Sequence, residues 1–250
     1  MRSVFLALFL LLVAVPVAPS FADEAVTSEA LDAAWAKRDE PAALKDLEAK
    51  VSTVLARRSE DPELIWRAAR LREWQADGAT DQNRKKLLGR ESWTLAERAL
   101  VKNPGSMQAH YYAALGIGQY SQAVGILSAL GEGLEGKFNN HLDTAIKLDI
   151  HFESAGGLTA KGRYWYELPW PKRSLARSAE TLQKALATSP QNLRAYVYLA
   201  ETQLKDGKAA VAKATLAKAE QGSVSYDPPE GKRAKEMART VAAEIAKELK

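Results

Sequence analysis

Cysteine is absent from the 250-residue sequence, and histidine occurs only three times. The lack of cysteine excludes disulfides, cysteine-ligated zinc, iron–sulfur clusters and thiol nucleophiles. A one-sided charge is lacking too, since 35 Lys and Arg face 31 Asp and Glu, for a net charge of +4. A mixed surface of this kind does not point to nucleic acid as a partner. We therefore expect no cofactor, no metal and no nucleic acid.

The sequence also lacks long alternations of β-branched and polar residues, which are typical of strands. Its most frequent residues are good helix formers, Ala above all. Capping residues and turn glycines divide it into roughly eleven short-linked helices, a pattern of stacked antiparallel pairs. The starts are marked at Ser28, Asp61-Pro62, Ser106 and Asn192, and the stops at Gly78, Gly207 and Gly222.

The first 22 residues resemble a targeting segment. Arg2 precedes an apolar run from Val4 to Val15, and Ser20 and Ala22 are small residues before a cleavage point. This pattern predicts a Sec-type signal peptide at 1–22, cut after Ala22, and a periplasmic or secreted protein without a membrane span after cleavage. An uncleaved membrane anchor is the alternative. A lipid anchor is not expected, because no cysteine stands at the cut site.

A degenerate repeat runs through the remainder, residues 23–250. The segment 99–104 ends in Asn-Pro and has an echo in 185–190 and a weaker one in 145–150, at intervals of about 40–46 residues. The last repeat fits the tetratricopeptide (TPR) consensus at Tyr196, Leu199, Ala200, Gly207, Ala212, Leu216 and Ala219. We therefore predict an all-α, TPR-like solenoid of antiparallel helical hairpins.

The solenoid is expected to form a single domain. It divides into N-terminal helices at 23–102, a TPR-like core at 103–222 and a capping helix at 230–250. Met237, Val241, Ile245 and Leu249 recur at every fourth position of that last helix. Packing on the last repeat explains this stripe, and a partner-binding helix is the alternative.

From Asn103 to Leu216 the sequence resembles the T-component family of TRAP transporters. The segments that carry the resemblance are, in order, Asn103-Pro104, 109–114, 125–127, 142–149, 155–157, 162–164, the Leu-Pro-Trp-Pro loop at 167–171, 185–192 and 198–201. The resemblance implies a non-catalytic periplasmic accessory of a solute uptake system. Its partner would be another envelope protein such as a solute-binding protein, and a small-molecule ligand would fit the same role. The alternative is a periplasmic TPR scaffold for protein–protein interactions unrelated to transport.

Aromatic residues gather in one stretch, where Tyr164, Trp165 and Trp170 follow Arg163. Tyrosine and tryptophan suit the walls of a pocket, and the arginine fork could hold a carboxylate of a ligand. Packing around a proline-stiffened loop is the other interpretation of these aromatics.

The inner helix face of a TPR solenoid usually receives the guest. Counting from the seam positions places Tyr111, Leu115 and Gln119 on that face in an earlier repeat, and Arg194 and Glu201 in the last one. Such a groove suits an extended peptide or a partner helix. The alternative is an ordinary face that meets solvent or the next helix.

Two further patterns resemble a phosphate-binding motif and a metal site, but each lacks a feature that the site requires. The run Gly131 to Lys137 matches the spacing of a phosphate-binding loop, but Phe138 replaces its Ser or Thr and no strand precedes it. His141 and His151 are too far apart to share one helix face as metal ligands. With no G-x-S-x-G motif either, we expect a binding protein and not an enzyme.

Overall fold

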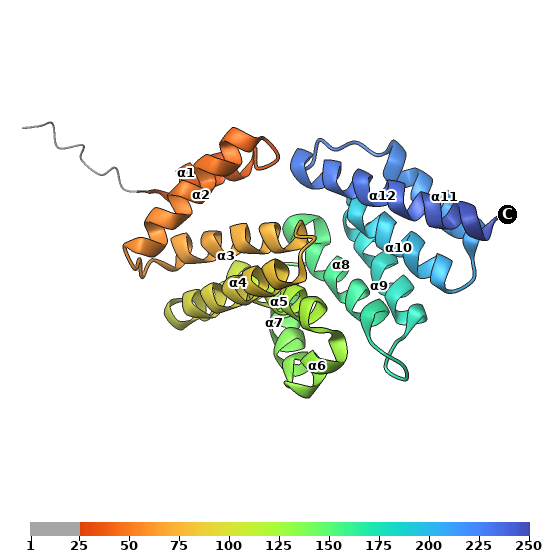
Figure 1. Ribbon diagram of the computed structural model, residues 1–250, viewed down its shortest axis with the longest axis horizontal. Helices are drawn as coiled ribbons and strands as arrows, with labels where there is room; N and C mark the ends of the chain where they lie inside the picture. The colour runs from red at the N-terminus through yellow and green to blue at the C-terminus, as the bar shows by residue number, and fades with distance from the viewer. Residues whose placement is uncertain (1–25) are drawn as a thin grey trace, which may run out of the picture.

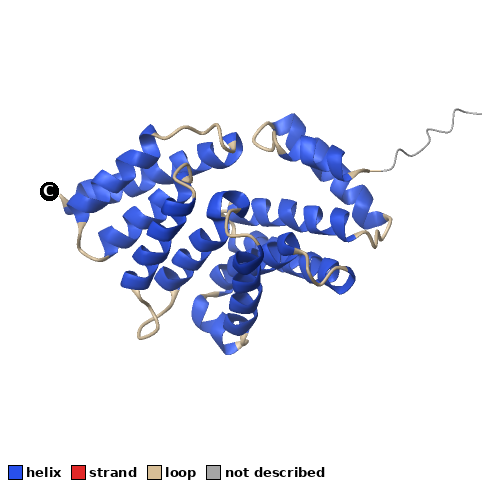
Figure 2. Cartoon of the chain, turned by 180° about the vertical axis from the view of Figure 1, so that it is seen from behind, coloured by secondary structure: helices blue, strands red, loops and turns tan. Residues whose placement is uncertain are grey.

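A computed structural model describes residues 26–250, and this part of the chain contains twelve α-helices and no strand (Figures 1 and 2). The helices are α1 Ser28–Trp35, α2 Pro41–Ala56, α3 Pro62–Asp77, α4 Gln82–Lys102, α5 Met107–Val124, α6 Ile126–Gly131, α7 Leu134–Leu148, α8 Phe152–Glu167, α9 Leu175–Thr188, α10 Leu193–Lys205, α11 Ala209–Gln221 and α12 Pro228–Glu248.

Side-chain caps fix several helix starts where the sequence predicts them. Asp61 accepts a hydrogen bond from the backbone N–H of Glu63, and Ser106 and Asn192 cap α5 and α10 in the same way. The first helix differs from the prediction by one residue. Its cap is Thr27, whose Oγ1 accepts from the N–H two residues after Ser28, so Ser28 is the first helical residue.

The helices pack side by side in chain order, and α4 and α5 approach each other most closely at two glycines. A Cβ at Gly116 would lie 2.5 Å from the backbone nitrogen of Trp93, and one at Gly89 would lie 2.7 Å from that of Tyr120. Neither position has room for a side chain, so these glycines set the distance between the two helices.

The buried apolar residues form three clusters that follow the chain. The largest is built from α1 to α7, the second from α8 to α10, and the third from α10 to α12. In the last hairpin, Ala200, Ala212 and Ala219 are fully buried at the seam. Gly207 makes the turn with a φ of 74°, a value that favours glycine. The predicted fold class, a TPR-like helical solenoid, is confirmed.

The solenoid curls until its two ends touch. The turn between α1 and α2 meets the start of α12, as the upper part of Figure 1 shows. Arg38 donates to Asp227 at 2.6 Å, and Lys232 pairs with Asp39. These contacts bring the first helical hairpin next to the start of the last helix.

Candidate functional site

A cavity of about 640 Å³ lies on the inner side of the curled solenoid. Its walls come from helices far apart in sequence, among them α3, α5, α8, α10 and α12. Apolar and aromatic side chains supply much of the lining, and charged side chains from α3, α8 and α12 project among them. A concave, mixed apolar and polar cavity is the default candidate for a binding site.

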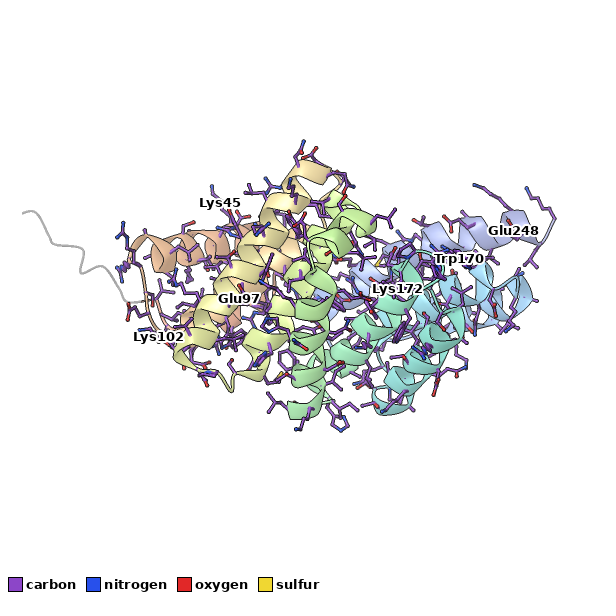
Figure 3. The ribbon with its side chains drawn as sticks, turned by 90° about the horizontal axis from the view of Figure 1, so that it is seen from below. Lys45, Glu97, Lys102, Trp170, Lys172 and Glu248 are labelled. Carbon is purple, nitrogen blue, oxygen red and sulfur yellow. The ribbon has the colours of Figure 1, made fainter. Side chains whose placement is uncertain are left out.

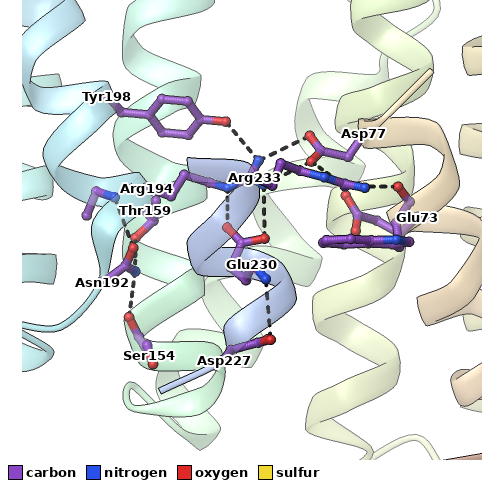
Figure 4. A network of polar contacts seen from close by, with 12 residues as sticks. Glu73, Asp77, Ser154, Thr159, Asn192, Arg194, Tyr198, Asp227, Glu230 and Arg233 are labelled. Carbon is purple, nitrogen blue, oxygen red and sulfur yellow. Dashed lines mark hydrogen bonds and ion pairs between the residues drawn. The ribbon is translucent and has the colours of Figure 1, made fainter. Parts of the chain in front are cut away.

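Asp77 organises the charges at one wall (Figure 4). Its carboxylate accepts two hydrogen bonds from Arg194, at 2.9 and 3.1 Å, and one from Arg233 at 3.0 Å. Arg194 also donates to both carboxylate oxygens of Glu230. The end of α3 is thereby joined to the first turns of α10 and α12.

The pKa values of two acids on α3, Asp77 and Glu73, are shifted in opposite directions. Burial raises the pKa of Asp77, but the guanidiniums of Arg194 and Arg233 outweigh burial and lower it overall. Glu73 lies one turn earlier and has no ion pair with any residue of the range 26–250. Burial, followed by the charge of Asp77, raises the pKa of Glu73 to about 7. One acid is thus held as a carboxylate, while the other is poised between its two forms near neutral pH.

Glu153 reaches the cavity from a strained turn at the start of α8. Glu153, Ser154 and Ala155 have φ values of 47°, 55° and 62°, the left-handed region that non-glycine residues rarely occupy. Neighbouring groups hold the turn in place, since Asn192 donates to the carbonyl of Ser154 at 2.7 Å and Tyr112 donates to Glu153 at 3.0 Å. Burial raises the pKa of Glu153. Strain of this kind concentrates at functional sites.

The cavity collects six of the nine site residues predicted from sequence. These are Tyr111, Leu115, Gln119, Arg163, Tyr164 and Arg194. Trp165, Trp170 and Glu201 are not part of its lining. The structure places the six together, and whether they bind a ligand stays a prediction.

The carboxylate fork expected at Arg163 is already occupied by the protein itself. Arg163 pairs with Glu201 and with Glu167, both at 2.7 Å. The aromatic residues that follow Arg163 lie in different surroundings. Tyr164 stacks on Phe138 at the cavity wall, whereas Trp170 is 86% exposed on the loop after α8, close to Lys172 (Figure 3).

Several lining residues were missed by sequence reasoning, because an acid or arginine on a helix gives no sign of which distant residue it meets. They include Glu73, Asp77, Glu153, Glu230 and Arg233. One signal was available in the pair Gly156-Gly157. A Cβ at Gly156 would collide with the hydroxyl of Tyr111, so this glycine marks a close approach to the cavity wall.

The other patterns singled out from sequence have structural explanations. Gly131 ends α6, and the glycine-rich run continues through a turn into α7. His110 and His141 face each other with their Nδ1 atoms 3.0 Å apart. Within residues 26–250, no group of three or more His, Cys, Asp or Glu is arranged to hold a metal ion.

The signal peptide predicted at 1–22 lies outside the described residues. Among the helices from residue 26 onward, none combines the length and the apolar character that crossing a bilayer requires.

Fold and cavity together define the class: a TPR-like helical-repeat protein with a cavity on its inner side. A solved relative in fold is a thermophilic TPR protein of Thermus thermophilus, with a TM-score of 0.63 over 87% of this chain and 100% of that one. Its sequence identity of 16% supports the fold alone.

The family follows from sequence. The profile of "Regulator of microtubule dynamics protein 1-3" matches residues 29–177, more than half of the chain, and the chain belongs to this family. Regulator of microtubule dynamics protein 1 of Bos taurus is 34% identical over 123 residues, which are 48% of this chain and 38% of the relative.

Further relatives match to a similar degree. The Pongo abelii protein 1 is 32% identical over 52% of this chain and 43% of its own. Regulator of microtubule dynamics protein 2 of Rattus norvegicus is 32% identical over 47% of this chain and 28% of its own. The alignments therefore cover less than half of the length of these curated relatives.

The resemblance to the TRAP T-component family was wrong, and so was the function drawn from it. The family profile and the relatives are those of regulators of microtubule dynamics. The physical reason lies in the residues that carried the resemblance. Ala113, Ala114, Leu199 and Ala200 are buried seam positions. Any tightly packed helical hairpin needs small or apolar residues there, so such positions specify the fold and not the family.

The predictions that depended on that resemblance fall with it. An envelope or solute-binding partner is wrong, because the matched family is not one of transport proteins. The periplasmic or secreted location, which was drawn from the pattern at 1–22 and not from the resemblance, is wrong as well, since the relatives are microtubule regulators of Bos taurus and Pongo abelii. Of the two functions weighed, the scaffold that acts through protein–protein interactions agrees better with these findings, without its periplasmic setting.

Proposed function

We propose that the chain is a non-catalytic binding protein that holds a segment of a partner protein in its central cavity and thereby acts in the regulation of microtubule dynamics. The observation that carries the binding role is the cavity itself. It offers about 640 Å³ on the concave side of a helical-repeat fold, and extended segments bind to such surfaces in helical repeats. The microtubule role is supported by membership of the family and by the names of the relatives.

The family match also includes much of the cavity. Residues 29–177 contain Glu73, Tyr111, Leu115 and Glu153, all of which line it. The helices that complete the wall, α10 and α12, follow the matched range. The proposed binding surface thus combines the family region with an additional C-terminal part.

The proposal is tested in a cell extract in which fluorescent microtubules grow and shrink. Adding the full chain should change the frequency at which growing microtubules switch to shrinkage. Leu115→Arg, which places a charged side chain into the cavity, should abolish the change. Val211→Arg is the matched control, because Val211 is 50% exposed on α11 and does not line the cavity.

Each result decides the proposal. Loss of the effect in Leu115→Arg alone, with unchanged helicity by circular dichroism, supports it. An unaltered switching frequency with the wild-type chain contradicts the microtubule role. Equal effects of the wild type and folded Leu115→Arg contradict the use of the cavity.

A further inference from the structure

The arginines of the cavity wall are already paired within the protein, whereas Lys85, which also lines the cavity, has no ion pair in the described residues and donates only to the side-chain amide of Gln122. Each arginine that lines it forms an ion pair with at least one carboxylate; these are Arg38, Arg163, Arg194 and Arg233. Glu73 and Glu153 line the same cavity, and neither has an ion pair in the described part of the chain. Among residues 26–250, Glu73 accepts only from the amide of Gln119, at 3.0 Å, and Glu153 only from the hydroxyl of Tyr112. Two acids of the cavity lining, Glu73 and Glu153, are therefore not neutralised by an ion pair within the described residues.

Hydrogen-bonding groups in the cavity are unmatched as well. Gln119 donates from its amide nitrogen to Glu73 and to Asp77, and its carbonyl oxygen is buried with no hydrogen-bond partner. Tyr111 is 8% exposed, lines the cavity, and its hydroxyl forms no hydrogen bond within residues 26–250. Buried polar atoms nearly always have partners, so the carbonyl oxygen of Gln119 points to a group that is not part of the chain, and the accessible hydroxyl of Tyr111 is open to the same group.

The unmatched groups share one chemistry. Carboxylates and an amide carbonyl accept hydrogen bonds, and a tyrosine hydroxyl can accept as well. Helix α5 contacts both acids, since Tyr112, which packs against Tyr111, donates to Glu153, and Gln119 donates to Glu73. Tyr111 and Tyr112 pack edge to face at 5.1 Å, and such aromatic rings attract cations through their faces. The missing group should donate hydrogen bonds and carry a positive charge.

We propose that the cavity binds a lysine or arginine side chain of the partner, with its cationic end beside Glu73 and Glu153. Ammonium and guanidinium groups carry several donors and no acceptor, which complements this lining. The volume of about 640 Å³ leaves room for the backbone on either side of the bound residue. The inference rests on the proposed function in taking the occupant to be a protein segment.

The test is an NMR titration of the full chain with a capped peptide that carries two lysines. Matched peptides carry norleucine or glutamate at the same positions, and n-butylamine represents the cationic end without a peptide. We expect the lysine peptide to bind at least about tenfold more tightly than the norleucine peptide, and the glutamate peptide not to bind. The shifts should be largest for residues of the cavity wall.

Variants identify the acids. Glu73→Gln and Glu153→Gln keep an oxygen that can accept from Gln119 and Tyr112 but lose the charge, and each should weaken binding about tenfold. Glu60→Gln is the control, because Glu60 is an exposed acid paired with Lys102 and lies outside the cavity. Tyr111→Phe removes only the hydroxyl and should also weaken binding. It replaces either glutamine variant if that variant fails to fold.

The outcomes are separable from those of the proposed function. Equal binding of the lysine and norleucine peptides, or unchanged binding in all folded cavity variants, overturns this inference. Butylamine that binds as tightly as the lysine peptide overturns the assignment to a protein segment. None of these results alters the microtubule assay with Leu115→Arg, whose failure would instead contradict the proposed function.

Discussion

Asp77 at the end of α3 and Arg194 at the start of α10 are 117 residues apart in sequence and form a bidentate ion pair. Their side chains are 18% and 15% exposed, so the pair is largely removed from water. Arg233 of α12 binds the same carboxylate. This one acid therefore joins the part of the chain that matches the family to the helices that follow it.

Removal of Asp77 should be costly. Asp77→Ala takes away the only carboxylate that pairs with Arg233 within residues 26–250 and one of two that pair with Arg194, and it leaves buried positive charge behind. We expect the free energy of unfolding to fall by about 3 kcal/mol, measured by urea denaturation. Asp46→Ala removes an exposed pair with Lys50 within α2 and should change it by less than about 0.5 kcal/mol. Equal effects of both variants would contradict the joining role of Asp77.

The contribution of Asp77 also has a defined pH dependence. Its pKa is lower in the folded protein than in the unfolded chain, so its stabilisation is present above about pH 4 and is lost as the pH falls further. The stability difference between the wild type and Asp77→Asn should therefore shrink between pH 4 and pH 2. A difference that stays constant over this interval would contradict the charged role of Asp77.

Glu73 should show the opposite behaviour. Its pKa rises from 4.5 to about 7 on folding, so ionisation of Glu73 costs stability as the pH increases from 4.5 to 7. Glu73→Gln cannot ionise and should be more stable than the wild type at pH 8, by about 1 kcal/mol, with no such gain at pH 4.5. Thermal unfolding at the two pH values measures this. A variant that is less stable than the wild type at pH 8 would show that the carboxylate of Glu73 has a stabilising partner.

The close approach of α4 and α5 gives a prediction about packing. Gly116→Ala places a methyl group against the backbone of Trp93 and should destabilise the protein by about 2 kcal/mol. Gly136→Ala is the matched control, because a Cβ at Gly136 meets nothing within 4 Å on an exposed face of α7. It should stabilise the protein by about 0.5 kcal/mol through helix propensity. Chemical denaturation of both variants gives the comparison.

Much of the fold could be predicted from the sequence, because its determinants are local. Asp61, Ser106 and Asn192 cap helices through atoms two or three residues away. Gly207 provides a turn that disfavours other residues, and the buried alanines of α10 and α11 repeat at helical spacing. These patterns define helices and hairpins without any knowledge of distant contacts.

The candidate site was only partly predictable. Repeat register places Tyr111, Leu115 and Gln119 on one inner face, and all three line the cavity. The charged wall of the cavity depends on Asp77 meeting Arg194 and Arg233, a pairing that no local pattern encodes. The left-handed turn at Glu153 was unpredictable for another reason, since that backbone region is normally occupied by glycine. The family was misjudged because residues at the seam between two helices are fixed by packing, and such positions specify the fold and not the family.

Site-specific photo-crosslinking tests the central claim, the binding of a partner inside the cavity, most directly. A photoreactive amino acid is placed at Leu115, on the cavity wall, or at Val211, an exposed position of α11 that does not line the cavity, and the full chain is irradiated in cells. We expect a discrete protein adduct from position 115 that is absent from position 211. An adduct from position 211 with none from position 115 would contradict it.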